Sequence, residues 1–278
     1  MAEIGRINTL TVKRLRDYGA HLDGGPQGDI RLPYRDVPPH CRPGDKVEVF
    51  VYPSEEGQLR ATTRKPKAMV GRFAKLRVVA AGPGGAFLDW GMAKDLFVPK
   101  AEQQGRMEPG RSYIVYLFFD EKGRRILASS RLARFLNQQP GHYQEGQEVD
   151  LLIHEQTDLG YRAIVNHSHE GMLYKNEVFQ KIFSGQQLRG YVKKVRDDGK
   201  LDLLLRKPGY QGVDAIALDV FRIIKRHGGS MAVTDKSRPE EIYALFGVSK
   251  KLFKKAIGAL YKKKLITIDA KGIRLGKG

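Results

Sequence analysis

Cysteine is almost absent from this sequence: Cys41 is the one cysteine among 278 residues. A single cysteine excludes an internal disulfide, and such low cysteine usage is typical of the reducing cytoplasm. The sequence also lacks an apolar run of the ~20 residues that a membrane-spanning helix needs. Its opening stretch, MAEIGRINTL, does not have the basic and then apolar pattern of a signal peptide. We therefore expect a cytoplasmic protein.

Acidic residues are scarce relative to basic ones. The chain has 49 Lys and Arg against 31 Asp and Glu, which gives a formal net charge of +18 and a pI of about 9.9. Such an excess favours a polyanionic partner, most often nucleic acid and less often an anionic membrane surface. A basic protein without such a partner is the alternative. Because no membrane segment is found, we expect nucleic acid as the partner and no membrane.

Glycine, in contrast, is abundant, and its spacing reveals a repeat. Three glycine triplets have successive separations of 14 and 25 residues. The second glycine opens the text GAHLD in the first triplet and GAFLD in the second. The third glycine precedes a run with alternating apolar positions, then a turn glycine and a short closing strand. The triplets are Gly5, Gly19 and Gly44, then Gly71, Gly85 and Gly110, then Gly146, Gly160 and Gly185.

Each repeat indicates roughly five short strands in about 60–65 residues, which is too long for a solenoid unit and fits a small closed barrel. Closure leaves no strand edge exposed. The glycine of the Gly-Ala-x-Leu-Asp text marks a bend where a Cβ would crowd the barrel. The third repeat diverges in its middle and has Tyr174 where the others have Pro33 and Pro99. We predict barrels over residues 1–66, 67–132 and 146–208, with a linker over 133–145 that contains a short helix broken at Pro140-Gly141.

The apolar period changes from two to 3.6 residues after Asp214. A first helix is expected up to Gly228, a second from a capping box that begins at Ser237, and a third capped by Ser249. Two short strands, LITID and GIRLG, follow. This order is typical of a winged helix-turn-helix, which we predict over residues 214–278. The expected fold class is mainly β with a C-terminal α+β domain.

The third predicted helix has lysines on one face and apolar side chains on the other. Gly258 lies among the lysines, where it lowers helix propensity by about 1 kcal/mol relative to Ala, so a close backbone approach is one reason for it. Residues 215–278 hold 15 Lys and Arg against 5 Asp and Glu. We expect the lysine face to contact a polyanion, rather than only water. The lysines concerned are Lys250, Lys251, Lys254 and Lys255.

Small five-stranded barrels commonly bind single-stranded nucleic acid, because aromatic side chains stack on bases and basic side chains contact phosphates. Each repeat offers such residues at positions expected to face outward, although core packing is the alternative for any single aromatic residue. The ring candidates are Tyr18, His21 and Tyr34, then Phe87, Trp90 and Phe97, then Tyr161 and Tyr174. The basic candidates are Arg31, Arg60 and Arg64, then Arg124, Arg125 and Arg131, then Arg162 and Arg206.

The text GAFLDWGMAKDLFVP, followed by the strand RILASS, resembles the S1-type RNA-binding domain, a member of the OB-fold group. Three such units and a winged helix resemble the conserved virulence factor B family of bacterial RNA-binding proteins along essentially the whole chain. The texts GMLYKNEVF, RGYVKKVRDDGKLDLLL and FGVSKKLFKKAIGALYKKKLI carry this resemblance. It implies a cytoplasmic, non-catalytic protein that binds single-stranded RNA and affects gene expression at the RNA level.

The resemblance also implies where RNA would bind. S1 domains have an aromatic residue on either side of the glycine of a Gly-Ala-Phe motif. Tyr18 and His21 occupy both positions in repeat one, whereas repeat two has only Phe87, because Gly84 stands at the other position. In repeat three only Tyr174 matches an aromatic position, that of the third strand. Repeat one is therefore expected to be the best equipped.

No catalytic or metal-binding constellation stands out. His167, His169 and Glu170 resemble metal ligands, yet no cysteine pair or second histidine cluster accompanies them, and a loop histidine pair is expected instead. Paired carboxylates such as Asp197 and Asp198 belong to hairpin turns, whereas a nuclease needs several that converge on a metal. We predict a protein that is not an enzyme and needs no cofactor.

Two other functions stay open from the sequence. A winged helix can lead a DNA-binding transcription regulator, but a helix with lysines alone suits phosphate contact better than base readout. It can also dock on a protein partner, for example at the ribosome. Preference for duplex DNA would favour the regulator, and loss of ribosome association on deletion of residues 215–278 would favour docking.

Overall fold

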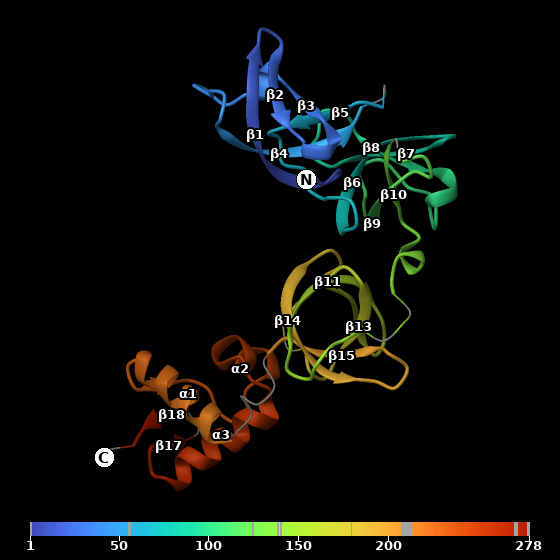
Figure 1. Cartoon of the computed structure of the whole chain (residues 1–278). Coiled ribbons are helices and arrows are strands. Elements are labelled where there is room, and N and C mark those ends of the chain that lie inside the picture. Colours follow the sequence, from blue (N-terminus) through green and yellow to red (C-terminus); the bar gives the residue numbers. More distant parts are fainter. Residues whose placement is uncertain are drawn as a thin grey trace. The chain divides into compact units, whose positions relative to one another are not determined.

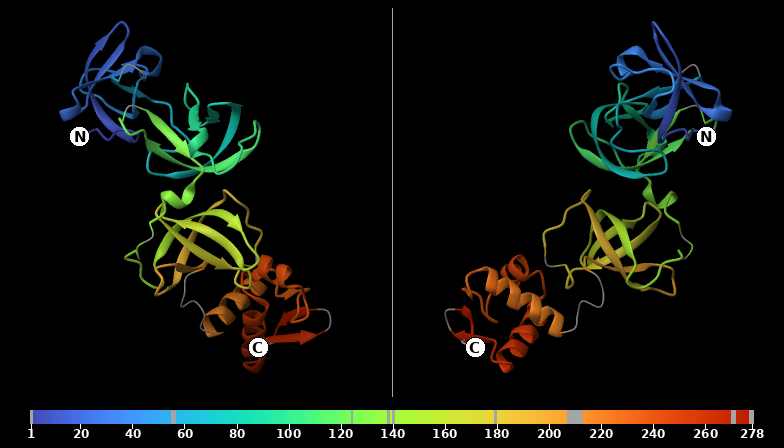
Figure 2. Two further views of the ribbon diagram at one scale, coloured as in Figure 1. Left: turned by 90° about the vertical axis from the view of Figure 1, so that its right-hand side faces the viewer. Right: turned by 60° about the vertical axis from the view of Figure 1, so that its left-hand side comes forward.

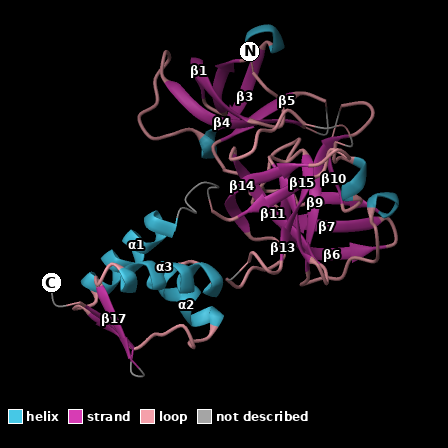
Figure 3. Ribbon diagram, turned by 90° about the horizontal axis from the view of Figure 1, so that it is seen from below, coloured by secondary structure: helices cyan, strands magenta, loops and turns pink. Residues whose placement is uncertain are grey.

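The computed structural model of the protein describes residues 2–54, 57–123, 125–137, 139, 141–178, 180–206, 213–269 and 272–276. Within these residues it contains three closed five-stranded barrels and then a region of three helices with a three-stranded sheet (Figure 1). Strands make up the barrels and helices dominate the C-terminal region (Figure 3). The predicted fold class is confirmed. Residues 1–136 and 137–278 form two compact units.

Barrel one contains β1 (Ile7–Arg16), β2 (Gly19–Asp23), β3 (Asp29–Pro33), β4 (Lys46–Pro53) and β5 (Leu59–Thr62). Its strand order is β1-β2-β3-β5-β4, with β1 and β4 closing the barrel and β3 parallel to β5. Side chains alternate as a period of two requires. In β3, Ile30 and Leu32 are buried in the core, whereas Arg31 between them is exposed.

Barrels two and three have the same strand order as barrel one. Two further views show the strand-built barrels and the helical C-terminal region (Figure 2). In both, the third strand again runs parallel to the fifth. Barrel two contains β6 (Phe73–Gly82), β7 (Gly85–Asp89), β8 (Leu96–Pro99), β9 (Ser112–Phe119) and β10 (Ile126–Ser129). Barrel three contains β11 (Glu148–Gln156), β12 (Gly160–Val165), β13 (His169–Tyr174), β14 (Gln187–Val195) and β15 (Leu201–Leu204).

The first and third glycines of each triplet make the same backbone hydrogen bonds in every barrel. Gly5 donates its N–H to the carbonyl of Val51 on the fourth strand (2.7 Å), and Gly44 donates to Val12 on the first strand (2.8 Å). All six glycines have positive φ, a backbone conformation that costs residues with a side chain more free energy than it costs glycine. The repeated spacing therefore reflects two fixed turns. The equivalent bonds join Gly71 to Leu117, Gly110 to Val78, Gly146 to Val192 and Gly185 to Ile153.

The second glycine of each triplet opens the second strand where the third strand passes very close. A Cβ on Gly19 would lie 2.1 Å from the carbonyl oxygen of Leu32, and one on Gly85 would lie 2.2 Å from that of Val98. Gly160 in barrel three is equally crowded. The predicted reason for the repeated Gly-Ala-x-Leu-Asp text is confirmed, because a side chain at this bend has no room.

The C-terminal region has the winged-helix order. Its helices are α1 (Val213–Arg226), α2 (Pro239–Phe246) and α3 (Lys250–Lys262). Its strands, β16 (Ser230–Met231), β17 (Ile266–Asp269) and β18 (Gly272–Leu275), pair in the order β16-β18-β17. Ser249 caps α3 as predicted, since its Oγ accepts a hydrogen bond from the N–H of Leu252 (3.3 Å). The predicted capping box at Ser237 is wrong: its Oγ accepts from Thr234 N–H instead, and α2 begins at Pro239 after Arg238.

Short 3-10 turns connect several strands. The predicted linker begins with one, Leu132–Arg134, after which the ring of Phe135 stacks on Tyr116 of β9 with 4.3 Å between ring centres. Pro140 lies outside the described residues. None of the helices that the structure describes is both long and apolar enough to cross a membrane. The other 3-10 turns are Gly25–Gln27, Tyr34–Asp36 and Lys100–Glu102.

Candidate nucleic-acid interface

Backbone pairing aligns five side chains across the outer face of barrel one. Arg14 on β1 is paired with His21 on β2, which is paired in turn with Arg31 on β3. Arg31 is paired with Arg60 on β5, and Arg60 with Tyr52 on β4. Arg14 and Arg31 are exposed and the other three are half-buried. These five residues, here called the barrel-one row, combine cationic and aromatic groups.

Tyr18 lies in the turn between β1 and β2 and joins two members of this row. Its ring is 48% exposed and meets the ring of His21 edge-on, with 5.8 Å between centres. The hydroxyl lies 3.0 Å from His21 Nε2, and the guanidinium of Arg31 lies over the ring at 4.6 Å. A cation over a tyrosine face is attractive and holds the ring in place. The sequence-predicted set of Tyr18, His21 and Arg31 is thus brought together.

The remaining barrel-one candidates flank this cluster. Tyr34 is 73% exposed, and its backbone N–H donates to the carbonyl of Tyr18 at 3.1 Å, which places the two tyrosines side by side. Arg64 is exposed beyond the end of β5. Barrel one therefore presents exposed tyrosines beside arginines.

Electrostatics at the barrel-one row depend on a carboxylate that the sequence did not single out. Asp29 contacts Nζ of Lys13 and a guanidinium nitrogen of Arg14, both at 2.8 Å, and lies 3.9 Å from Nδ1 of His21. The hydrogen bond from Lys13 lowers the pKa of Asp29, which stays ionised. Burial, followed by the charge of Arg14, lowers the pKa of His21. The imidazole is therefore neutral at pH 7, and the positive charge comes from the arginines.

The equivalent row in barrel two has no charged side chain. Phe87, on β7, is 42% exposed and its ring centre lies 5.0 Å from that of Phe97 on β8. Both were predicted to face outward, and they do so together. The barrel-two row can offer aromatic and aliphatic surface but no cation. In strand order it consists of Ala80, Phe87, Phe97, Leu127 and Phe118.

Trp90 does not face outward, so that part of the prediction is wrong. Its side chain is 7% exposed, and its indole N–H donates to the carbonyl of Lys94 at 2.7 Å. The indole ring meets Phe50 of β4 edge-on at 5.8 Å, and both belong to one buried cluster with Leu88. Barrel one thus inserts a phenylalanine beside the tryptophan, which the spacing of the sequence does not reveal.

The predicted arginines of barrel two lie outside its row. Arg124 falls outside the described residues. Arg125 is exposed near the β9–β10 turn, 3.7 Å from the carboxylate of Asp120. Arg131 donates its Nε–H to the carbonyl of Ala101 at 2.8 Å. Neither Arg125 nor Arg131 is therefore part of the barrel-two row.

Barrel three has charged groups in its row, but they are largely paired with one another. Arg162 contacts Glu155 at 3.2 Å, and Arg196 contacts Asp202 at 2.7 Å. Arg196 also donates a hydrogen bond to the hydroxyl of Tyr174. Of the two cations in the row, Arg162 is thus paired, whereas Lys194 is exposed and has no ion pair among the described residues. The barrel-three row consists of Glu155, Arg162, Met172, Asp202 and Lys194.

Two further candidates of the third repeat have other roles. Tyr161 does not face outward as predicted: it is half-buried and packs against the barrel-three core. It directly follows Gly160, and the alternation of the strand turns that position inward and Arg162 outward. The guanidinium of Arg206 lies 5.4 Å over the ring of Tyr243 in α2.

The exposed face of α3 is basic, as expected from the sequence. Phe253, Ala256 and Leu260 are buried on the opposite face. Lys250 is folded back, with its Nζ 3.3 Å from the carbonyl of Lys236, and Lys254 lies 3.4 Å from Asp235. We call the exposed side chains the lysine stripe. It consists of Lys251, Lys254, Lys255, Tyr261 and Lys262.

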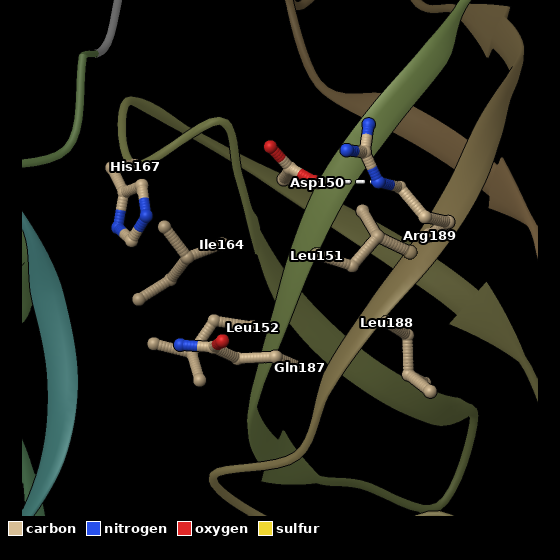
Figure 4. A pocket seen from close by; sticks show the side chains of 8 residues that line it. All are labelled: Asp150, Leu151, Leu152, Ile164, His167, Gln187, Leu188 and Arg189. Carbon is tan, nitrogen blue, oxygen red and sulfur yellow. Dashed lines mark ion pairs between the residues drawn. The ribbon is translucent and has the colours of Figure 1, made fainter.

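A pocket of about 340 Å³ opens on β11, β12 and β14 of barrel three (Figure 4). Leu152 and Ile164 line the pocket and are 3% and 1% exposed. Their neighbours along each strand belong to the barrel-three core, so these two side chains lie on the opposite face of the strands. Asp150 and Arg189 form an ion pair of 3.1 Å at its edge (Figure 4). The expected loop histidine pair is only partly right: His167 lies in the turn before β13, whereas His169 begins that strand and is buried, 3.1 Å from the Tyr143 hydroxyl. The pocket combines apolar walls with a neutralised pair and does not extend the basic surface.

Comparison with known proteins agrees with this arrangement. The model of the S1 domain family matches residues 4–64 and 70–129, and that of the CvfB-like winged helix domain matches residues 219–275. Conserved virulence factor B from Staphylococcus aureus strain N315 is 23% identical over 284 residues, which cover 99% of this chain and 94% of that protein. The protein of the same name from Staphylococcus epidermidis is also 23% identical, and the match covers 95% of its length.

A solved structure from Streptococcus pneumoniae TIGR4, described as a multidomain protein with nucleic acid binding domains, is 24% identical and covers 98% of both chains, with a TM-score of 0.39. The two matched domain types, S1 and winged helix, indicate nucleic-acid binding, and neither defines an enzyme family. With S1 domains, a CvfB-like winged helix domain and relatives of one name along its whole length, the chain belongs to the conserved virulence factor B family.

Proposed function

We propose that the protein binds single-stranded RNA in the cytoplasm, without catalysis, and regulates bacterial gene expression at the RNA level. The observation that supports this most is the barrel-one row with its neighbour Tyr18. The guanidinium of Arg31 lies over the ring of Tyr18, and Arg60 is the strand neighbour of Arg31 in the same row. Single strands are bound by this combination, because bases stack on rings while phosphates contact cations.

Barrel one is proposed as the main RNA site because it alone combines both groups within one row. The barrel-two row offers Phe87 and Phe97 without a cation. In the barrel-three row, Arg162 is paired with Glu155. The barrel-three row also contains no aromatic ring on which a base could stack, so it lacks the second group that barrel one has.

The test is the affinity of the full chain for labelled single-stranded RNA, measured by fluorescence anisotropy. Tyr18→Ala combined with His21→Ala is expected to weaken binding about 10- to 100-fold, since stacking contributes roughly 1–3 kcal/mol per base. The matched control is Arg162→Ala, which changes the position of barrel three that corresponds to His21. An unchanged affinity in the double variant, or an equal loss in the control, would contradict the proposed site.

Duplex nucleic acid is a second candidate ligand, favoured by the lysine stripe of α3. Lysine contacts phosphates as a point charge without reading bases. We propose this helix as an accessory contact, tested by titrating duplex DNA in parallel with RNA. If duplex DNA binds more tightly and alanines at Lys250, Lys251, Lys254 and Lys255 abolish it, a DNA-binding regulator replaces the RNA proposal.

A further inference from the structure

Gly258 lies in the middle of α3, and no described part of the protein explains why a glycine is there. A Cβ placed on it would meet no heavy atom within 4 Å outside the helix backbone. This differs from Gly19, where a Cβ would collide with a carbonyl oxygen at 2.1 Å. Alanine would therefore fit at this position and would favour the helix.

The surroundings of Gly258 are unusual for an exposed helix position. At about 100° per residue, every member of the lysine stripe lies within about 60° of Gly258 around the helix axis. Long side chains thus surround a position that has none. Because Gly258 has no side chain, its backbone lies below the level of the exposed side chains around it, among them Tyr261, and we call this position the notch at Gly258.

Several of the surrounding charges are available to a ligand. In the part of the chain that the structure describes, Lys251, Lys255 and Lys262 have no ion-pair partner. Lys254 contacts the carboxylate of Asp235 at 3.4 Å. A small anion that enters the notch would meet unpaired cations on both sides and no side chain below it.

We propose that the notch at Gly258 seats a phosphate of a nucleic-acid backbone, which thereby contacts α3 directly. The inference rests on the proposed nucleic-acid binding and adds the residue that lets the strand approach. Any side chain at position 258 would hold the phosphate away from the helix backbone and farther from the ammonium groups of the surrounding lysines. The lower helix propensity of glycine is then offset by the closer phosphate contact. Single-stranded RNA and duplex DNA share this phosphodiester chemistry.

The test compares Gly258→Ala and Gly258→Leu with the unchanged full chain. Thermal unfolding is expected to show the winged helix stabilised by a few degrees (about 4–8 °C per kcal/mol in a small domain) in Gly258→Ala. The affinity for nucleic acid is expected to fall, by about two- to fivefold in Gly258→Ala and about tenfold in Gly258→Leu, because the charge-assisted contact with the phosphate becomes longer. Labelled RNA of about 40 nucleotides and duplex DNA are titrated separately, so that the arm that weakens identifies the strand type.

Two controls separate this inference from the proposed function. Ala244→Leu adds similar bulk to an exposed position of α2 and is expected to leave both affinities unchanged. Lys251→Ala with Lys255→Ala is expected to weaken binding. If these lysines matter but Gly258→Leu binds like the unchanged chain, the notch is refuted while the proposed function stands. If the lysine pair has no effect either, α3 holds no phosphate and the inference fails. If the unchanged chain binds neither RNA nor duplex DNA, the proposed function fails as well.

Discussion

At the residue scale, the carboxylate of Asp29 limits the charge that barrel one presents. It holds Lys13 and Arg14 at 2.8 Å each, on the side of the row where His21 and Tyr18 lie. Two cations that could reach phosphates are thus partly neutralised. Because these groups are exposed, the ion pairs contribute little to stability and can exchange for phosphate contacts.

Asp29→Asn is therefore expected to strengthen RNA binding by about two- to fivefold at low salt, because it removes a repulsive charge and frees two cations. Anisotropy with single-stranded RNA measures this. Asp120→Asn, which frees Arg125 outside the barrel-two row, is the matched control and should have a smaller effect. Equal or weaker binding by Asp29→Asn would show that Lys13 and Arg14 do not face the RNA.

Two adjacent glycines allow the repeat to be tested as a folding requirement. Gly85→Ala would place a Cβ 2.2 Å from Val98 O, whereas a Cβ on Gly84 meets nothing within 4 Å. We expect Gly85→Ala to destabilise barrel two by about 2–4 kcal/mol and Gly84→Ala to change stability by less than about 0.5 kcal/mol. Trp90, the one tryptophan of the chain, is buried in barrel two and reports its unfolding in urea. Equal urea midpoints for both variants would mean that the neighbouring strand moves to make room for the Cβ of Gly85→Ala without loss of stability.

At the element scale, the sequence predicted the strands and helices well but not which side chains meet. Period-two alternation and the glycine triplets identify the barrels because they report local geometry. Each first strand, however, has an irregularity, between Val12 and Arg14 in barrel one, that shifts the register. As a result Arg14 rather than Lys13 opposes His21, which alternation alone does not show. Contacts between barrels, such as Phe50 with Trp90, depend on tertiary packing and leave no local pattern.

The three barrels place different chemistry at the same strand positions. Barrel one has arginines, barrel two phenylalanines, and barrel three paired charges. Phosphate contacts release counterions and make affinity depend on salt, whereas stacking does not. The two binding modes are therefore separable by experiment.

Arg31→Ala with Arg60→Ala is expected to flatten the plot of log affinity against log salt by about 0.7 for each phosphate that the variant no longer neutralises. Phe87→Ala should lower affinity by about tenfold without changing the slope, since stacking on one ring contributes roughly 1–3 kcal/mol. Titrations at several salt concentrations measure both. A flattened slope in Phe87→Ala would mean that barrel two holds phosphate after all.

At the scale of the whole molecule, positive charge is distributed over both compact units. Residues 215–278 carry 15 of the 49 Lys and Arg, and barrel one carries the arginine row. Two sites on one chain increase affinity only for a ligand long enough to occupy both, because the second contact is then intramolecular. A ligand that reaches one site gains nothing from the other.

RNA length therefore distinguishes one site from two. An RNA of about eight nucleotides can fill one barrel, whereas about 40 nucleotides can extend further. Alanines at Lys250, Lys251, Lys254 and Lys255 are expected to weaken binding of the longer RNA by about tenfold or more and leave the shorter RNA unaffected. Tyr18→Ala with His21→Ala should weaken both. If the lysine variant loses the same affinity at both lengths, its lysines act on the barrel-one site through the overall field of the protein, and α3 is not a separate contact.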